Sequence, residues 1–357
     1  MSPLGIGNRR GSVGLQLRHP LMKGAGTLSD KSDLVRSAAT GASIRTKELY
    51  VTRQYTVREV VHSYYRAVLA RELVKVQERA VEIAEEAAED ARKREREGLV
   101  VAIDVSRAEI RVARTKDALD RQQQEERAAM DRLMLAIGSG VGETPDLTDS
   151  LPEPDMEIPA ASEAIRTALV KRAEISIYDD RIADQERRIA MAADELRPAL
   201  DIVAGFDSVS GSRGVISTSL WDRGSLLAGL QYRVSLDRRI SLEKRDTSAR
   251  QRDVLEKLRD YKAEEIAEQV WDAYRSLETA RTSLSIQTDN LEVAEDNLSL
   301  AQRTVDEGLQ DNRNVLEAQD SLIGLESGIL SARTQLYLAA VDLRYYTGED
   351  LTQIWAD

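Results

Sequence analysis

The fold is decided by residues 270–348, which read VWDAYRSLETARTSLSIQTDNLEVAEDNLSLAQRTVDEGLQDNRNVLEAQDSLIGLESGILSARTQLYLAAVDLRYYTG. This stretch aligns without a gap on residues 60–138 of the same chain. The identical positions of the first copy are Val60, Tyr64, Ala70, Arg71, Gln77, Glu82, Ala84, Glu85, Ala91, Glu97, Gly98, Leu99, Val105, Ala108, Ala129, Leu133 and Gly138. Ungapped self-similarity of this length indicates a duplicated supersecondary unit.

Each copy predicts a long helical hairpin. Large apolar residues recur every seventh position, and alanines follow three positions later, as in the seam of a closely packed coiled coil. The large residues are Val270, Leu277, Leu284, Leu291, Leu298 and Val305, and the alanines are Ala273, Ala280, Ala294 and Ala301. A second seam runs from Val315 to Leu343 in a different phase. Between the two seams, Gly308 supplies the positive φ that ends a helix, and Gly98 does so in the first copy. A kink within one continuous helix is the alternative, which the change of phase disfavours.

Composition excludes several classes of protein. Of the 357 residues, 42% are hydrophobic, 31% charged and only 4% aromatic, which favours long helices over a large compact core. The net charge of −12 argues against nucleic acid as a partner. The chain has no cysteine, so it has no disulfide framework or thiolate metal site. No window provides the ~20 apolar residues of a membrane helix, and Met1 to Arg10 lack the apolar core of a signal peptide.

Three short segments alternate between apolar and polar residues, which is the period of a half-buried strand. They are residues 12–18, 199–207 and 226–234. The apolar faces of the second and third segments are Leu200, Ile202, Ala204 and Phe206, and Ala228, Leu230, Tyr232 and Val234. Such two-faced strands suit a membrane β-barrel, although an ordinary small sheet under a helical domain is an equally valid reading of the pattern.

The duplication also predicts a missing segment. Residues 229–233 echo residues 14–18, so each hairpin follows a similar strand. A helix at 160–196 and a strand at 199–207 precede the second of these echoing strands, whereas only Met1 to Gly11 precede the first. Three strands are also an odd number for a closed antiparallel barrel. We therefore expect that an N-terminal helix and strand, together with a signal peptide, are missing from this sequence.

The order of these elements resembles the TolC-like family of outer-membrane efflux proteins. Three motifs carry the resemblance: Arg197 to Asp201, with Pro198 leading a strand; Glu307 to Gln319, a Gly-Leu tip followed by Asn-Val-Leu-Glu-Ala-Gln; and Leu15 to Gly26. The resemblance implies a mainly α fold, with coiled-coil hairpins in two pseudo-repeats and short strands that form part of a trimeric membrane β-barrel. It implies a homotrimer in the outer membrane with a periplasmic extension. The implied partners are outer-membrane lipid, a periplasmic adaptor protein and an inner-membrane pump, with no cofactor or metal.

On this basis the chain divides into seven segments. The expected boundaries are a first barrel strand and loop at 1–27, a first hairpin at 28–138, a proline-rich connector at 139–159, a helix at 160–197, barrel strands at 198–235, a second hairpin at 236–348 and a tail at 349–357.

The resemblance also implies the functional residues. The adaptor-contacting tips are Gly98, Leu99, Gly308 and Leu309. The positions of the tunnel entrance are Asp104, Asn314 and Glu317. In this family the residue at Asp104 is held by a tyrosine and an arginine, but Val305 and Gln310 stand at those positions here. We therefore expect a weaker or different latch.

No catalytic constellation is present, and His19 and His62 are expected to be solvated or capping residues. Two rival functions stay open, a periplasmic adaptor and a coiled-coil scaffold. The doubled hairpin without a flanking β-rich module argues against an adaptor. The alternating segments near Pro198 and Gly229 argue against a scaffold, which does not need strands between its hairpins.

Overall fold

The computed structural model describes residues 11–98, 100–140, 146–147, 151, 160–210, 224–307 and 313–354. The chain is mainly helical and divides into two compact units. The strand unit comprises Met1–Glu48 and Glu174–Tyr261, and the hairpin unit comprises Leu49–Ala173 and Lys262–Asp357. Two long helices, α1 (Asp30–Arg96) and α5 (Arg239–Asp306), contribute residues to both units.

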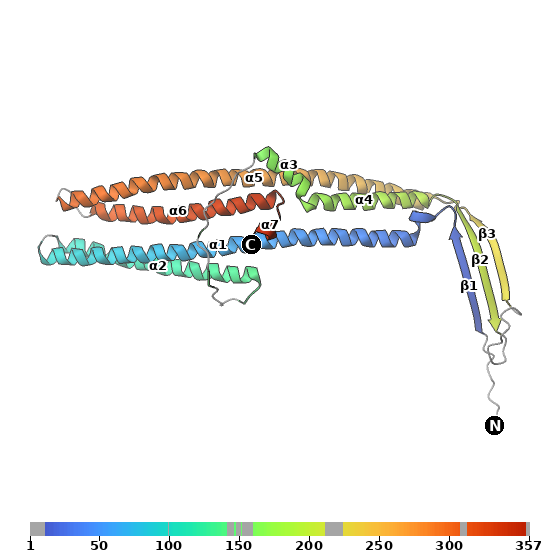
Figure 1. Ribbon diagram of the computed structural model, residues 1–357, viewed down its shortest axis with the longest axis horizontal. Coiled ribbons are helices and arrows are strands. Elements are labelled where there is room, and N and C mark those ends of the chain that lie inside the picture. Colours follow the sequence, from blue (N-terminus) through green and yellow to red (C-terminus); the bar gives the residue numbers. More distant parts are fainter. Residues whose placement is uncertain are drawn as a thin grey trace, which may run out of the picture. The chain divides into compact units, whose positions relative to one another are not determined.

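The strand unit contains an antiparallel sheet with the order β1-β2-β3. Its strands are β1 (Gly11–Pro20), β2 (Ala199–Ser210) and β3 (Gly224–Arg233), which lie side by side in Figure 1. Leu17 pairs with Ala204, which pairs with Ala228 on the other side. The three alternating segments of the sequence are therefore confirmed as strands of one sheet.

The two faces of the sheet differ sharply in polarity. Because side chains alternate along a strand, the register places one apolar set on a single face: Leu15, Leu17, Leu200, Ile202, Ala204, Phe206, Leu226, Ala228, Leu230 and Tyr232. Leu226 and Leu230 are 83% and 72% exposed. The other face carries Gln16, Arg18, Asp201, Gln231 and Arg233, together with Val203 and Leu227, and His19 is the polar residue that the register adds to the apolar face. The strand unit thus leaves its apolar face uncovered.

Helix α4 (Ala173–Asp194) joins the starts of the two long helices within the strand unit. Its Asp180 accepts hydrogen bonds from Ser43 and Lys47 of α1, at 3.0 and 2.6 Å. On the α5 side, Arg259 donates to Asp179 at 2.6 Å. A short 3₁₀ turn, η1 (Gly26–Leu28), leads from β1 toward α1.

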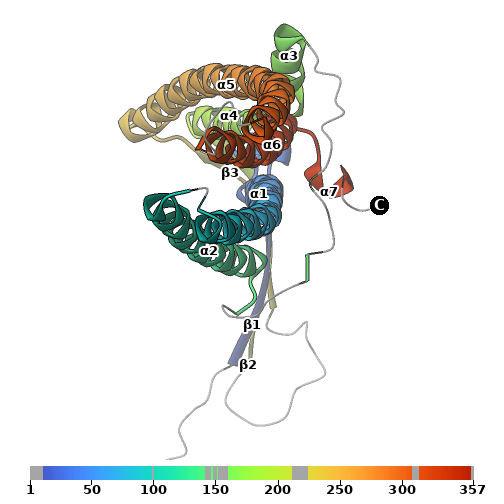
Figure 2. The ribbon, with the colours of Figure 1, turned by 90° about the vertical axis from the view of Figure 1, so that its left-hand side faces the viewer.

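The hairpin unit confirms the duplication. Helix α1 ends at Arg96 and α5 at Asp306, which are aligned positions of the two copies. The return helices are α2 (Ala102–Ile137) and α6 (Arg313–Tyr346). Each is followed by a left-handed glycine at the aligned position, Gly138 with φ of 78° and Gly348 with φ of 79°. Figure 2 shows α1 paired with α2 and α5 paired with α6.

The core of the hairpin unit is the heptad seam. The seam residues Val270, Ala273, Leu277, Ala280 and Ala294 of α5 are buried. In the first copy, Ala88 and Ala91 of α1 pack on Val105 and Ala108 of α2. Small side chains at these positions let the helices approach closely. No described helix combines the length and the apolar character needed to cross a membrane.

One expected helix is broken in two. The sequence predicts a single helix over residues 160–196, but the structure has α3 (Ala161–Lys171) and α4, separated by Arg172 in an extended conformation with ψ of 123°. The Arg172 guanidinium donates to Gln269 at 2.6 Å. Gly348 lies against residues 171 and 172, where a Cβ would be 3.1 Å from that of Lys171. Tertiary contacts, rather than a local breaker residue, fix this break.

A further short helix closes the described chain. Helix α7 (Leu351–Ile354) is held on α1 by Gln54, which donates to Asp350 at 2.6 Å and accepts from the backbone N–H of Leu351 at 2.9 Å. Leu351 is fully buried, so the end of the second copy is anchored on the first.

Candidate functional site

The first hairpin reverses at the glycine that the sequence indicates. Gly98 has φ of 75°, and its N–H donates to the carbonyl of Glu95 at 2.9 Å. Helix α2 then begins after Val101, whose backbone is extended. A side chain at position 98 would meet no atom within 4 Å, so only the backbone conformation requires glycine there. The predicted turn at Gly98 is confirmed, whereas Leu99 lies outside the described residues.

The second hairpin is described up to both sides of its turn. The backbone N–H of Glu307, next to the end of α5, donates to the carbonyl of Arg303 at 3.0 Å, and α6 begins at Arg313. Gly308, Leu309 and Gln310 lie between these points, outside the described residues. Their roles therefore stay predictions.

The residues predicted to form the entrance, Asp104, Asn314 and Glu317, lie near the starts of the return helices. Asp104 of α2 accepts a hydrogen bond from Arg107 of the same helix at 3.4 Å. Glu317 of α6 is 63% exposed and accepts from Arg313 at 2.9 Å. Asn314 is exposed in the first turn of α6. The ion pairs of Asp104 and Glu317 are thus local and do not join the two hairpins.

Sequence reasoning missed the residue that does join the hairpins near their ends. Arg111 of α2 donates to Asp320 at 2.7 Å and to Gln319 at 3.2 Å, both on α6. Its side chain is only 13% exposed. Arg111 follows the buried Ala108 by three positions, so an arginine at seam spacing was the available signal. It lines a cavity of about 500 Å³ together with Arg107 and Arg114.

Further from the turns, polar contacts join α1, the other helix of the first hairpin, to α6. Arg79 of α1 donates to Glu326 of α6 at 2.8 Å. Beyond it, Asp342 of α6 accepts from Arg58 at 2.6 Å and from His62 at 2.8 Å, both on α1. Polar contacts thus tie the first hairpin to α6 at successive levels along the helices.

His62 corrects one expectation. It is not solvated but 7% exposed, in contact with Asp342. Burial raises the pKa of the Asp342 carboxyl, but the hydrogen bonds from His62 and Arg58 outweigh this effect and hold that pKa below its ordinary value. Asp342 therefore stays ionised throughout the neutral range. No cluster of three or more metal-ligating side chains occurs in the described part of the chain.

Comparison with solved structures defines the class of fold. The chain matches CusC, in a structure described as following folding and transmembrane channel formation, with a TM-score of 0.77 at 15% identity over 96% of this chain and 84% of that chain. It matches the MtrE outer-membrane channel of Neisseria gonorrhoeae with a TM-score of 0.75 at 15% identity, over 96% of this chain and 80% of that one. The CmeC outer-membrane channel of Campylobacter jejuni gives 0.72 at 12% identity, over 97% and 80%. The fold is that of TolC-like outer-membrane channels.

The family follows from the sequence model of outer membrane efflux proteins, which matches residues 164–349, just over half of the chain. This protein belongs to the outer membrane efflux protein family. No curated relative matches the chain significantly.

Proposed function

We propose that the chain is one protomer of a homotrimeric outer-membrane channel that serves an efflux or type I secretion system. In this proposal, residues 1–27 and 198–235 supply strands to a membrane β-barrel. The hairpins at 28–138 and 236–348 line a tunnel through the periplasm, with residues 139–159 as the connector, 160–197 as the intervening helical segment and 349–357 as the tail.

The observation that carries the proposal is the two-faced sheet. Leu15, Leu17, Leu226, Leu230 and Tyr232 project from one face and are all exposed. Removing apolar surface from water contributes about 25 cal/mol of favourable free energy per Å², and this uncovered face forgoes that contribution in water. A lipid bilayer removes this penalty, while the opposite face of the sheet, with Arg18 and Gln231, suits a water-filled lumen.

The hairpin ends supply a docking surface for a periplasmic adaptor that couples the channel to an inner-membrane pump. We assign Gly98, Leu99, Gly308 and Leu309 to that surface. Val101 and Ile103, just after the first turn, are 62% and 56% exposed. Their apolar side chains extend the surface that an adaptor hairpin would cover.

Arg111 and Asp320 form the latch that replaces the family's usual one. Their ion pair holds α2 to α6 near the hairpin ends, where Asp104 has only Arg107 as a described partner. The Asp320 partner is 64% exposed, and ion pairs open to solvent stabilise a conformation by about 0.2–1 kcal/mol. Loss of this pair therefore favours opening modestly.

Single-channel recording in planar bilayers tests the proposal. We expect the purified protein to form mostly closed pores, and Arg111→Ala to raise their open probability by up to about fivefold. Asp104→Ala is the matched control on the same helix, expected to change little. In the same recordings, Glu317→Ala is expected to lower cation selectivity, because three symmetry copies of Glu317 would attract cations at the entrance.

A protein that forms no pores at all would contradict the channel. Pores with equal open probability in wild type and Arg111→Ala would contradict the latch alone.

A further inference from the structure

A cavity of about 610 Å³ lies in the strand unit, where the sheet meets the starts of two long helices. Arg18, Asp201 and Arg233 line it from the polar face of the sheet. Residues just before and within the first turns of α1 and α5 line it from the other side. The proposed channel uses the polar face of the sheet as a wall of its lumen, but it assigns this cavity no ligand.

The cavity is positive in a chain that is strongly negative. The chain carries a net charge of −12. The cavity is lined by six cationic and four acidic side chains, for a net charge of +2. The cations are Arg18, Lys23, Lys31, Arg197, Arg233 and Arg238. This local reversal of charge requires an explanation beyond the composition of the chain.

Three of these cations are not used by the fold. Arg18 contacts Asp201, Lys23 donates to the carbonyl of Glu195 at 3.3 Å, and Arg197 pairs with Asp194 at 3.3 Å. By contrast, the side chains of Lys31, Arg233 and Arg238 are exposed and make no hydrogen bond or ion pair with any residue that the structure describes. Their charges are therefore available to a ligand.

The helix starts add to this positive potential. The first N–H groups of a helix have no partner in the helix and carry a partial positive charge. Helix α5 has no acidic residue in its first turn, although Asp237 accepts from the N–H of Arg239 at 3.1 Å. Asp30, at the start of α1, is the one lining carboxylate without a described partner, and it opposes anion binding.

We propose that this cavity binds a phosphate-type oxyanion. Arginine presents several N–H donors in a plane and binds phosphate through two hydrogen bonds at once, which suits Arg233 and Arg238. The cavity is larger than a phosphate group, so it has room for part of the molecule that carries the phosphate. A direct binding measurement tests this site whether or not the protein acts as a channel.

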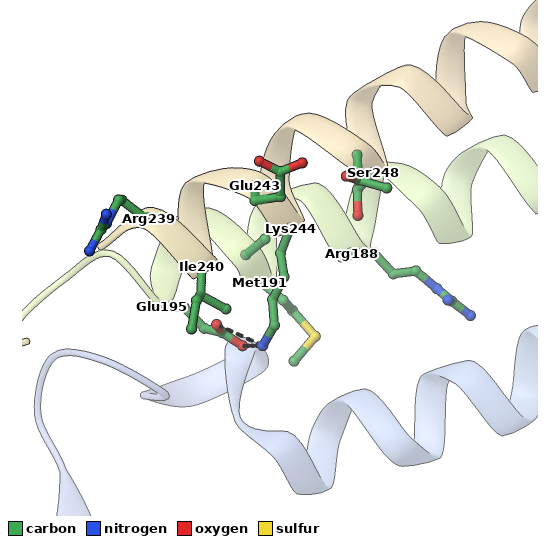
Figure 3. A pocket seen from close by; sticks show the side chains of 10 residues that line it. Arg188, Met191, Glu195, Arg239, Ile240, Glu243, Lys244 and Ser248 are labelled. Atoms are coloured by element: carbon green, nitrogen blue, oxygen red, sulfur yellow. Dashed lines mark hydrogen bonds and ion pairs between the residues drawn. The ribbon is translucent and has the colours of Figure 1, made fainter. Parts of the chain in front are cut away.

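The phosphate belongs either to a soluble solute or to a lipid headgroup. A neighbouring apolar groove distinguishes these two sources, because only a lipid has an acyl chain that could bind there. Figure 3 shows this groove of about 630 Å³ between α4 and α5, lined by Met191 and Ile240. Glu195 lines both spaces and accepts from Lys244 at 3.3 Å. Ile240 is 71% exposed, so the groove offers apolar surface to an acyl chain beside the phosphate site.

Isothermal titration calorimetry of the purified protein with inorganic phosphate, at low ionic strength, tests the site. We expect the double variant Arg233→Gln, Arg238→Gln to weaken phosphate binding at least about tenfold, since each lost charge-assisted hydrogen bond has roughly that effect. Asp30→Asn is expected to strengthen binding, because it removes the opposing charge. Added salt is expected to weaken phosphate binding by the unchanged protein and by Asp30→Asn.

The matched control is Arg245→Gln, Arg252→Gln, which removes the same charge from α5 outside the cavity, where both arginines pair with neighbouring aspartates. Native mass spectrometry with added phosphatidylglycerol identifies the source. A retained lipid that is lost in Ile240→Asn indicates a headgroup, whereas phosphate binding without lipid retention indicates a soluble phosphate. Absence of phosphate binding, or equal weakening by the cavity and control variants, would overturn the site.

Discussion

The double variant Leu226→Arg, Leu230→Arg is expected to be lost from the outer-membrane fraction. Both side chains lie on the exposed apolar face of the sheet. In a membrane β-barrel, an arginine on the lipid face costs about 2–4 kcal/mol near the bilayer midplane. Two such changes approach the whole stability of a typical domain, about 5–15 kcal/mol. Fractionation of cell envelopes, followed by immunoblotting, measures the loss.

The matched control is Gln231→Arg, which places the same side chain next to Leu230 but on the polar face. It is expected to leave the protein in the outer membrane. The opposite reading of the sheet, as part of a water-exposed domain, predicts that all these variants behave alike, because exposed surface substitutions change stability by less than about 0.5 kcal/mol. Normal outer-membrane levels of the double leucine variant would therefore refute the lipid-facing assignment.

The double variant Leu99→Asp, Leu309→Asp is expected to abolish export while leaving the proposed trimer intact. In the proposed complex these leucines supply the apolar contact with the adaptor at both tips, and a buried unpaired carboxylate there would be strongly unfavourable. Dye efflux from cells that lack other outer-membrane efflux channels measures export. Sedimentation in detergent checks the assembly.

Substitutions of the tip glycines test how much the backbone conformation at the tips, rather than the leucine side chains, contributes to export. Gly98→Ala and Gly308→Ala, made together, are expected to reduce export partly, since an L-residue at the positive φ of Gly98 costs about 1–2 kcal/mol. Gly138→Ala carries the same strain at the other end of α2 and is expected to export normally. Full efflux in the double aspartate variant would show that the adaptor, if one binds, contacts another surface.

The repeat and the seam were predictable because both are one-dimensional patterns. The spacing from Val270 to Val305 fixes which face of α5 is buried, and the glycines at 98 and 138 mark where α2 is entered and left. Strand polarity was predictable for the same reason. The register confirms that Leu230 and Gln231 lie on opposite faces.

The misses share a different cause. The break at Arg172 depends on Gln269 and Gly348, which are distant in sequence. The burial of His62 likewise depends on Asp342, and the role of Arg111 on Asp320. These contacts exist only once separate helices have packed together, and no periodic pattern within one helix encodes such pairings.

Spin labelling along β3 tests the central claim, that the sheet lies in a membrane with one face toward lipid. The chain has no cysteine, so single cysteines at consecutive positions from Leu226 to Tyr232 need no prior removal of native thiols. In the protein reconstituted into lipid bilayers, collision with oxygen should be high at Leu226, Leu230 and Tyr232. Collision with a water-soluble nickel complex should be high at the alternate positions. Labels that respond to the nickel complex alike on both faces would contradict the claim.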